Sequence, residues 1–422
     1  MRTRRHILGL LGGCLLSVGT ARRTWGQAAA RLVVVGGGFA GATCAKYLRL
    51  ADSTLQVTLL APQPTFISCP FSNTVLAGLN DLTMLTQHYT ALRQRHGIHV
   101  LHKAAADVEP VRRQVLLADG QRLAYDRLVL APGVEMHWDA LPGYDAAAST
   151  LWPHAWQAGP QTLLLRRQLE AMPDGGLVVI TVPDNPYRCP PGPYERASLI
   201  AHYLKTHKPR SKVLLLDTKD SFTKQALFQE AWQRLYGSLL EWVPGSQGGR
   251  VARVAPQRQT IETDFDTYRP SVANIIPPQR AAAIARVAGL DAGTGWCAVT
   301  PQTFESTVHA GIHLLGDAII ANPMPKSAFS ANNQAKVCAA ALLALLRGHP
   351  LPEPFLLNTC YSLVAPDYGI HIAGAYHVVD QRLTAMAGSE GTSPLGAPDE
   401  IRGLEAEYAR SWYANILADV FS

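Results

Sequence analysis

Several features common in membrane and electron-transfer proteins are missing from this chain of 422 residues. No stretch after residue 30 reaches 18 apolar residues, so the sequence predicts a soluble mature protein with no membrane span. None of the seven cysteines belongs to a CxxC pair, which excludes a thioredoxin-like motif, a zinc ribbon and a CxxCH haem-attachment site. We therefore predict no metal site, and any haem must belong to another chain.

Acidic residues are absent from positions 1–30, where arginines supply five units of the formal net charge of +6. Without this segment the net charge is about +1, which gives no argument for nucleic-acid binding. Arg4 and Arg5 stand directly before an apolar run, Ile7 to Val18, that is too short to span a bilayer. The pattern predicts a signal peptide of the twin-arginine type and a periplasmic protein. A general secretory signal and lipoprotein attachment at Cys14 are the alternatives.

The mature chain opens with a strand, a glycine-rich turn and a helix. An apolar β-branched run at 31–35 leads into Gly36, Gly38 and Gly41, which have GxGxxG spacing, and a helix is expected from about 42 to 50. The first glycine allows a tight turn, the second lets the backbone approach a pyrophosphate, and the third permits close helix–strand packing. We expect the phosphates of a dinucleotide at the positive end of this helix.

Two later segments indicate FAD as that dinucleotide. The strand and small-residue turn that end at Gly133 resemble the second FAD fingerprint of flavoproteins with two dinucleotide domains. A later strand ends in Gly316 and Asp317, and it resembles the third FAD fingerprint of these proteins. In that superfamily this aspartate meets the ribityl and phosphate end of FAD. The acid expected after the strand at 56–60 is missing, because Ala61 stands there. The contact to the adenosine ribose is therefore unassigned.

A second nucleotide-binding motif is also missing. Residues 176–181 look like the first strand of a second nucleotide-binding domain, but Pro183 and Pro186 follow where a nicotinamide site needs glycines. Proline removes amide donors, and without glycine the backbone cannot approach a pyrophosphate. The sequence predicts that the scaffold is retained while NAD(P)H is not the reductant.

Two cysteines lie in chemically suggestive surroundings. Cys189 comes shortly before a helix expected at about 194–204, beside Arg188 and near Arg196. Positive charge and a helix N-terminus favour the thiolate, so we predict a low pKa for this thiol, with a buried structural cysteine as the alternative. Cys69 lies in a loop after the second strand, where a thiol could be joined to the flavin 8-methyl group. The cysteines expected in the core are Cys44, Cys297 and Cys338.

Five segments outside the generic FAD fingerprints carry a more specific resemblance, at residues 68–73, 153–156, 188–198, 320–327 and 358–362. On these segments the chain resembles the flavoprotein subunit of flavocytochrome c sulfide dehydrogenase over essentially the whole mature length. The resemblance implies an 8α-S-cysteinyl bond between Cys69 and FAD. It also implies a redox disulfide between Cys189 and Cys360 over the flavin.

The resemblance further implies FAD-dependent oxidation of sulfide to sulfur or polysulfide, with electrons passed to a cytochrome c subunit. Glu195 would manage protons, although stabilisation of the helix dipole also explains a carboxylate there. Lys326 would stabilise the reduced flavin, with a plain surface lysine as the alternative. The rival functions are a sulfide:quinone reductase and an accessory flavoprotein that serves a sulfur-oxidising complex without turnover.

We expect an α/β protein with two Rossmann-like dinucleotide-binding domains, on the plan of glutathione reductase, and a C-terminal interface domain. The FAD domain is predicted at 31–142 and 279–350, interrupted by a nucleotide-domain-like region at 143–278 without a working NAD site. The interface domain is predicted at 351–422.

Aromatic and aliphatic residues between Tyr408 and Phe421 mark one face of a C-terminal helix. Packing against the core is the favoured interpretation of this face. Contact with a haem subunit near Trp412, or shallow docking on a membrane, are the alternatives.

Overall fold

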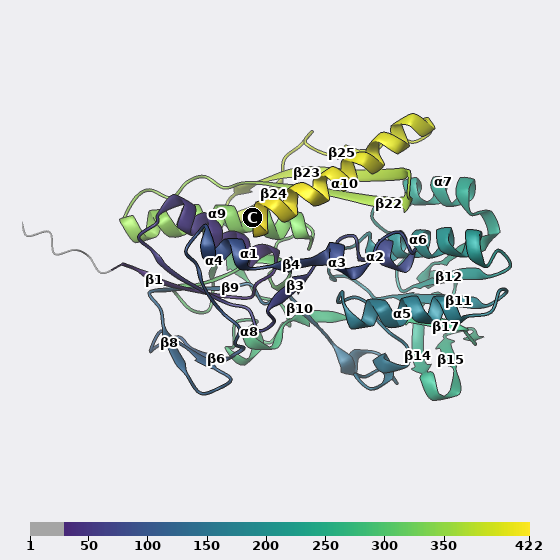
Figure 1. The fold of residues 1–422 in the computed structure, drawn as a ribbon, viewed down its shortest axis with the longest axis horizontal. Helices are drawn as coiled ribbons and strands as arrows, with labels where there is room; N and C mark the ends of the chain where they lie inside the picture. Colours follow the sequence, from purple (N-terminus) through teal and green to yellow (C-terminus); the bar gives the residue numbers. More distant parts are fainter. Residues whose placement is uncertain (1–28) are drawn as a thin grey trace, which may run out of the picture.

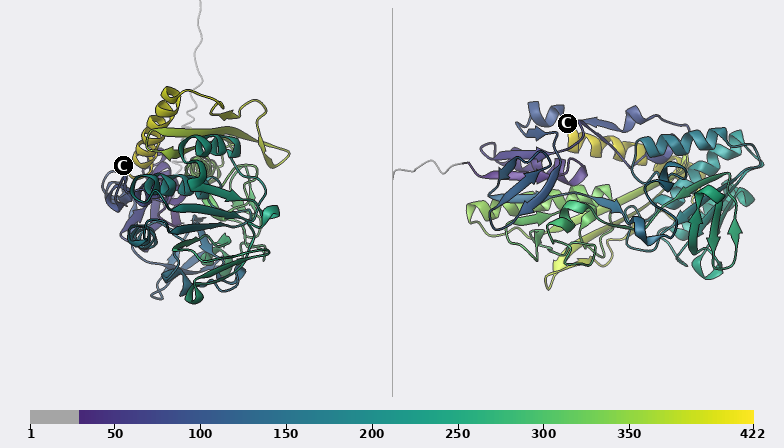
Figure 2. Two further views of the ribbon diagram at one scale, coloured as in Figure 1. Left: turned by 90° about the vertical axis from the view of Figure 1, so that its right-hand side faces the viewer. Right: turned by 90° about the horizontal axis from the view of Figure 1, so that it is seen from below.

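The computed structural model describes residues 29–422, so the predicted signal peptide lies outside the described residues except for Ala29 and Ala30. Two α/β parts lie at opposite ends of the longest axis of the molecule (Figures 1 and 2). The C-terminal segment runs along one side of both parts (Figure 1).

The first part is built on a seven-stranded sheet in the order β19-β20-β21-β9-β1-β2-β5. Its strands are β1 (Arg31–Val35), β2 (Gln56–Leu60), β5 (His99–Leu101), β9 (Arg127–Leu130), β19 (Val299–Thr300), β20 (Glu305–Ser306) and β21 (Ile312–Leu314). The five from β21 to β5 pair in parallel. These strands are nearly continuous apolar runs, as expected for parallel strands that are buried on both faces. The helices α1 (Phe39–Ala51) and α9 (Ala328–Arg347) pack against each other beside this sheet.

The glycine-rich turn between β1 and α1 has no room for side chains. Gly36 has φ +106°, and a Cβ added there would lie 2.2 Å from the carbonyl oxygen of Ala131. A Cβ on Gly41 would lie 1.9 Å from the carbonyl oxygen of Gly36. The glycines at these positions are therefore required by the close approach of β1, β9 and α1.

The second part has a four-stranded parallel sheet in the order β13-β12-β11-β17. Its strands are β11 (Leu177–Val182), β12 (Lys212–Asp217), β13 (Leu240–Val243) and β17 (Val272–Ile275), and its helices are α5 (Pro160–Ala171), α6 (Gly192–His207) and α7 (Gln225–Leu235). A small antiparallel sheet, formed by β14 (Val251–Ala255), β15 (Thr260–Thr263) and β16 (Thr267–Tyr268), is attached to it. The helix expected at about 194–204 is thus longer at both ends.

The chain passes between the two parts twice, and the two passages pair with each other. β10 (Val134–Met136) leaves the first part and β18 (Gln279–Ala281) returns to it, as an antiparallel ladder. This ladder lies beside the predicted domain limits, which stay a prediction.

The remaining elements of the first part are short. They are β3 (Thr65–Ile67), α2 (Ser72–Leu76), α3 (Leu82–Leu85), β4 (Thr86–His88), α4 (Thr90–Gln94), β6 (Ala105–Glu109), β7 (Gln114–Leu117), β8 (Arg122–Ala124) and α8 (Ala283–Val287). The loop that carries Cys69 joins β3 to α2, so it is held between two ordered elements.

The C-terminal segment consists of a long antiparallel hairpin, β22 (Phe355–Ala365) and β23 (Tyr368–Val379), the short strands β24 (Arg382–Ala385) and β25 (Gly391–Thr392), and α10 (Asp399–Phe421). The predicted apolar face of α10 packs largely into the molecule. Tyr413 stacks on Phe71 with ring centroids 4.4 Å apart, and Phe421 stacks on Phe66 with ring centroids 5.5 Å apart. Tyr408 is 49% exposed. Most of the predicted apolar face therefore serves core packing.

The close approach at the glycine turn gives a first prediction. Gly36→Ala should lower the free energy of unfolding by about 2–4 kcal/mol, because it adds both a positive-φ strain and a clash with backbone. Gly120→Ala is the matched control, since Gly120 has φ +85° but nothing within 4 Å of an added Cβ. It should cost only about 1–2 kcal/mol. Urea denaturation measures both values, and equal losses would contradict the role of the close approach.

Candidate functional site

A cavity of about 880 Å³ lies where the first sheet, the start of α6 in the second part and the C-terminal hairpin meet. Its volume is at the upper end of the range of about 300–1,000 Å³ that is usual for ligand sites. Most of the residues predicted as a site line it: Gly36, Gly38, Cys69, Gly133, Cys189, Glu195, Asp317 and Cys360. Gly41 and Lys326 do not line it. Within residues 29–422, no group of three or more histidine, cysteine or acidic side chains could hold a metal ion.

One end of the cavity fits a dinucleotide. The glycine turn exposes its backbone there at the start of α1, where amide groups and the helix dipole favour a phosphate. Asp317 Oδ1 is buried and accepts no hydrogen bond from any residue between 29 and 422. Such an orphaned acceptor is satisfied by the hydroxyl groups of a bound ribityl chain. The glycine turn at the start of α1 and the carboxylate of Asp317 together fit FAD.

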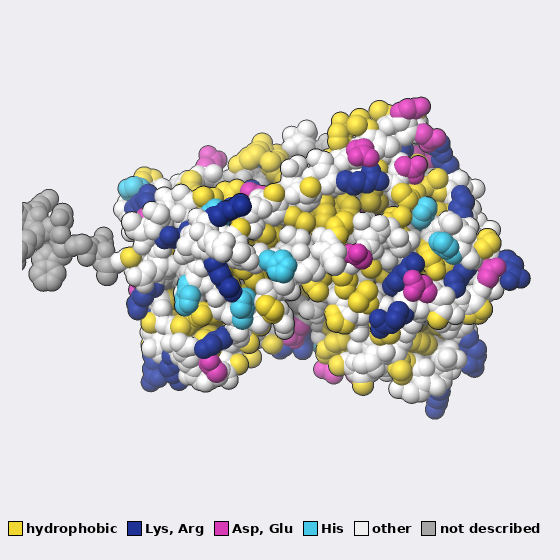
Figure 3. Space-filling view, in the orientation of Figure 1, with side chains coloured by type: hydrophobic (Ala, Val, Ile, Leu, Met, Phe, Trp, Pro, Cys, Tyr) yellow, Lys and Arg dark blue, Asp and Glu magenta, His cyan; other side chains and the backbone are white. Residues whose placement is uncertain are grey.

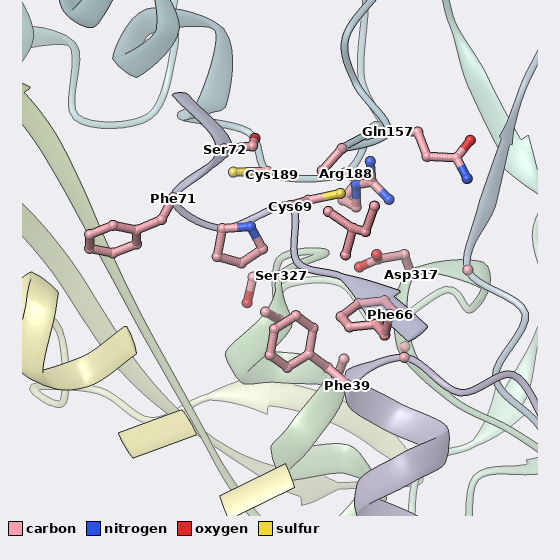
Figure 4. Close-up of a pocket in the computed structure, with 18 of the residues that line it drawn as sticks. Phe39, Phe66, Cys69, Phe71, Ser72, Gln157, Arg188, Cys189, Asp317 and Ser327 are labelled. Atoms are coloured by element: carbon pink, nitrogen blue, oxygen red, sulfur yellow. The ribbon is translucent and has the colours of Figure 1, made fainter. Parts of the chain in front are cut away.

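Cys69 lies on the wall of the cavity beside Arg188 (Figure 4). Its Sγ atom is 3.8 Å from the carbonyl oxygen of Trp156, and the guanidinium of Arg188 donates to the same oxygen. Figure 4 shows Asp317 on the same side of the cavity as Arg188. A half-buried thiol, a cation and a carboxylate are thus gathered along one edge.

Cys189 and Cys360 enter the cavity from different parts of the chain. Cys189 has φ +58° and lies just before α6, where its amide donates to the carbonyl oxygen of Lys326 at 2.8 Å. Cys360 lies in the middle of β22, on the hairpin that crosses both parts. Both are free thiols in the structure. The redox disulfide therefore stays a prediction.

The predicted low pKa of the Cys189 thiol is wrong. Burial raises its pKa well above the ordinary value, and the neighbouring Cys360 and Glu195 raise it further. The positive charges of Arg188 and Lys224 lower the pKa by less. The cations and the helix terminus can be recognised in the sequence, but the loss of water around the thiol depends on the fold.

Glu195 is a half-buried carboxyl group on the first turn of α6. Asn73 Nδ2 donates to its Oε1 at 3.1 Å. Burial raises the pKa of Glu195, while the hydrogen bond from Asn73 and the charge of Lys224 lower it. A carboxyl group whose pKa is raised above its ordinary value is better suited to accept and release protons.

A buried arginine connects the walls of the cavity. Arg196 is 3% exposed and its guanidinium donates to Asn73 Oδ1 at 3.0 Å and to Asn274 Oδ1 at 3.0 Å. It also donates to the carbonyl oxygens of His154 at 2.9 Å and Ala155 at 2.6 Å. Burial lowers the pKa of Arg196 to about 10, so it stays charged at neutral pH.

Lys224 is a further residue beside the cysteines that was not predicted from the sequence. This lysine directly precedes α7, is 9% exposed, and donates from Nζ to Ser362 Oγ at 2.7 Å and to the carbonyl oxygen of Cys360 at 3.2 Å. A lysine at the start of an amphipathic helix looks like an ordinary surface residue. No sequence signal points to its burial, because β22, which covers it, lies more than a hundred residues later.

Lys326 is also buried, but its ammonium group turns away from the cavity. Nζ donates to the carbonyl oxygens of Asp317 at 2.8 Å and Ile319 at 2.5 Å, and it lies 3.9 Å from the ring centroid of Trp296. Burial lowers the pKa of Lys326 to about 8. Lys326 is therefore neither a plain surface lysine nor a residue of the cavity wall. Lys326 instead holds the backbone on which Asp317 is carried.

The second part lacks a free acid where a nucleotide domain presents one to a ribose. Asp217, at the end of β12, is fully buried and accepts from Tyr194 Oη at 2.5 Å, Lys219 Nζ at 2.7 Å and Trp242 Nε1 at 3.1 Å. Its acceptors are used inside the protein. The expected loss of the NAD site stays a prediction.

His154 gives a prediction on pH dependence. It is 5% exposed, its Nδ1 accepts from the amide of Trp156, and burial together with Arg196 and Arg188 lowers its pKa to about 4. Because the folded pKa lies below the unfolded one, the neutral ring stabilises the fold above about pH 6.5, and this stability is lost as the pH falls toward 4.

Between pH 6.5 and 4 the loss due to His154 should reach about 3 kcal/mol. His154→Asn keeps an acceptor but cannot be protonated, so its free energy of unfolding should fall less over this range. Urea denaturation at several pH values, with pH 8 as the reference for each protein, measures the difference. Parallel pH curves for the two proteins would contradict the assignment.

Comparison with known families gives three matches along the chain. Residues 162–277 match the model described as sulfide dehydrogenase [flavocytochrome c] flavoprotein chain, central, and residues 352–421 match flavocytochrome c sulphide dehydrogenase, flavin-binding. Residues 30–157 match the pyridine nucleotide-disulphide oxidoreductases.

The sequence of this chain is also similar to those of individual proteins. The chain is 60% identical over 45 residues, 11% of its length, to a sulfide dehydrogenase [flavocytochrome c] flavoprotein chain from Chlorobaculum thiosulfatiphilum, and this match covers 94% of that sequence. It is 22% identical over 263 residues to the mitochondrial sulfide:quinone oxidoreductase of Dictyostelium discoideum, over 58% of this chain and 56% of that one.

Among solved structures, the sulfide:quinone oxidoreductase from the hyperthermophilic bacterium Aquifex aeolicus superposes with a TM-score of 0.71 at 15% identity. The superposition covers 93% of this chain and 92% of that chain. The likeness concerns the fold, and with the two parallel sheets it confirms the predicted α/β class with two Rossmann-like domains.

Proposed function

Because this chain belongs to the family of flavocytochrome c sulfide dehydrogenase flavoprotein chains, which are flavin-dependent sulfide oxidoreductases, we propose that it oxidises sulfide at Cys189 and Cys360 and delivers the electrons to a c-type cytochrome. The observation that carries the proposal is one cavity that holds a dinucleotide cradle at one end and both cysteines with Glu195 at the other. Thiol chemistry and flavin chemistry thus share one enclosed space.

FAD is the cofactor that the cavity fits: the glycine turn would hold its phosphates, and Asp317 would accept from its ribityl chain. When bound, FAD would supply an acceptor for the two electrons that sulfide yields at the cysteine pair, and it could release them singly to a haem. We further propose that Cys69 is joined to it through the 8α carbon. The position of Cys69 on the cavity wall, next to the cation of Arg188, supports this.

In the oxidised protein we propose a disulfide between Cys189 and Cys360. Hydrosulfide attacks one sulfur, forms a persulfide on that cysteine, and leaves the other as a thiolate. Glu195 lies beside both cysteines and is held by Asn73, so it can take the proton that the persulfide gives up. Arg188 and Lys224 offset part of the negative charge that these steps create.

The proposed cytochrome partner has an apolar face available to it. Apolar side chains gather between α10 and the α2–α3 segment (Figure 3). On α10 itself, Leu404 and Tyr408 are 44% and 49% exposed. Trp412, on the same helix, lines the cavity. Electron transfer needs a short path between flavin and haem, and docking at this face would provide one.

We propose that the protein acts in the periplasm after export by the twin-arginine route. The arginine pair and the short apolar run near the N-terminus support this proposal. In the described part of the chain, no helix combines the length and hydropathy that crossing a membrane requires.

The cysteine route predicts a clear result for Cys189→Ser. Flavin-loaded protein with its haem subunit should reduce cytochrome c in the presence of sulfide. The rate of the variant should be at least about 100-fold lower, because no disulfide can form. Stopped-flow absorbance of the haem measures the rate. Cys297→Ser is the control, since Cys297 is fully buried away from the cavity.

The outcomes separate the candidate functions. Full activity of Cys189→Ser would contradict the cysteine mechanism. Activity with a quinone in place of cytochrome c would favour a sulfide:quinone reductase. Reduction of the flavin by NADH would contradict the loss of the nicotinamide site. No turnover with either acceptor, despite bound flavin, would favour the accessory role.

The covalent bond predicts a different behaviour for Cys69→Ala. After acid precipitation, the flavin of the unaltered protein should stay with the polypeptide, whereas the variant should release it into the supernatant. Absorbance of the two fractions measures this. Cys44→Ala, at a buried cysteine in α1, should retain its flavin. Release from the unaltered protein would show that the flavin is held without a covalent bond.

A further inference from the structure

Lys224 is a buried ammonium group attached to the strand that carries Cys360. Both of its hydrogen-bond acceptors, Ser362 Oγ and the carbonyl oxygen of Cys360, belong to β22. Its backbone has φ +66°, a left-handed conformation that is unfavourable for lysine. The position of this charge is therefore tied to the position of Cys360.

Both acceptors are uncharged, and a buried charge that is held only by neutral groups costs free energy. Two groups that can become negative, Cys360 and Glu195, lie close enough to act on Lys224, followed by Cys189 and then Glu405 of α10. The ammonium group gains a full counter-charge when one of these groups ionises. The geometry favours Cys360, because Lys224 is hydrogen-bonded to the peptide group of that residue.

The reaction at the disulfide creates such a charge. Hydrosulfide brings one negative charge and attacks a sulfur, one S–S bond forms and one breaks, and the charge moves to the sulfur that leaves. A leaving sulfur is better when its thiolate is more stable. The cation beside one of the two cysteines can therefore decide which of them leaves.

We propose that Lys224 is a positioning residue that stabilises Cys360 as the leaving thiolate, so that hydrosulfide attacks Cys189 and the persulfide forms there. The inference rests on the proposed function, to which it adds the direction of the first step. The proton of the new persulfide goes to Glu195, and no oxidant other than the disulfide itself is needed.

The other charges around the pair agree with this direction. Arg188 faces Cys189, but its guanidinium donates to the carbonyl oxygen of Trp156 and also faces Cys69 and Asp317. Arg196 faces Cys69, Cys189 and Glu195, but its donors are filled by neutral acceptors. Burial raises the thiol pKa at both cysteines, and it does so most at Cys189, where the pKa lies well above its usual value.

The test uses the flavin-loaded protein with Cys189→Ser, so that Cys360 stays a free thiol. Alkylation by iodoacetamide at a series of pH values, read by mass spectrometry of the peptide that contains Cys360, gives the pKa of this thiol without any sulfide. Adding Lys224→Met should raise that pKa by about 1–3 pH units, because a nearby cation is lost. Lys224→Arg should restore most of the original value.

Lys219→Met is the matched control. Lys219 is also a buried lysine, with a side chain 9% exposed, but it is paired with Asp217 in the second part. Its loss should destabilise the fold and leave the pKa of Cys360 within a few tenths of a pH unit. An equal shift in this control, or no shift in Lys224→Met, would overturn the role of Lys224. Should Lys224→Met fail to bind flavin, Lys224→Gln replaces it in the same comparison.

A second measurement tests the direction of attack. Unaltered protein is treated with sulfide under anaerobic conditions, alkylated and digested, and the persulfide is located by mass spectrometry. We expect it on Cys189, and a persulfide on Cys360 would overturn the inference. A persulfide on neither cysteine would overturn the proposed function, while a shifted pKa in Lys224→Met would still support the electrostatic effect of Lys224.

Discussion

The buried guanidinium of Arg196 is the contact on which the site depends. One planar group, rooted on α6, holds α2 through Asn73, the segment at 154–155 through its carbonyl oxygens, and β17 through Asn274. A lysine could not fill these acceptors, because its ammonium group cannot present donors in a fixed fork. Removing the fork would leave several buried oxygens without partners, each at a cost of about 1–3 kcal/mol.

The elements that meet at this guanidinium carry the functional side chains. Cys69 comes just before α2, Glu195 precedes Arg196 directly, and Trp156, whose carbonyl oxygen lies beside Cys69, follows the held segment. The ring of Trp156 also lies 4.8 Å from the guanidinium carbon. One guanidinium therefore holds α2, which follows the loop of Cys69, against α6, which carries Glu195.

Burial then sets the electrostatic character of the site. Loss of water raises the pKa of Cys189, Cys360, Glu195 and Asp317, because burial penalises the charged form of each group. Interactions between charges are stronger in such a space than at the surface. The cations that face these groups thus have large effects, and the position of each cation matters more than the number of cations.

The amino-acid sequence by itself determined the scaffold. GxGxxG spacing, parallel apolar strands and the absence of glycines after β11 are local properties, since a tight turn or a buried strand needs particular residues at particular positions. The segments around Cys69, Cys189 and Cys360 were also sufficient to indicate the family, because their side chains are unusual for the superfamily.

Only the tertiary structure decided the electrostatics and the neighbours of these cysteines. The prediction of a low pKa for Cys189 was wrong because desolvation depends on everything that packs around the thiol, including a hairpin far along the chain. The burial of Lys224 could not be predicted for the same reason, since it arises from packing of β22. Lys326 looked like a flavin contact, yet the fold turns its ammonium group to backbone carbonyls. Local spacing cannot report which distant segments exclude water from a charged group, and that exclusion determines what the group can do.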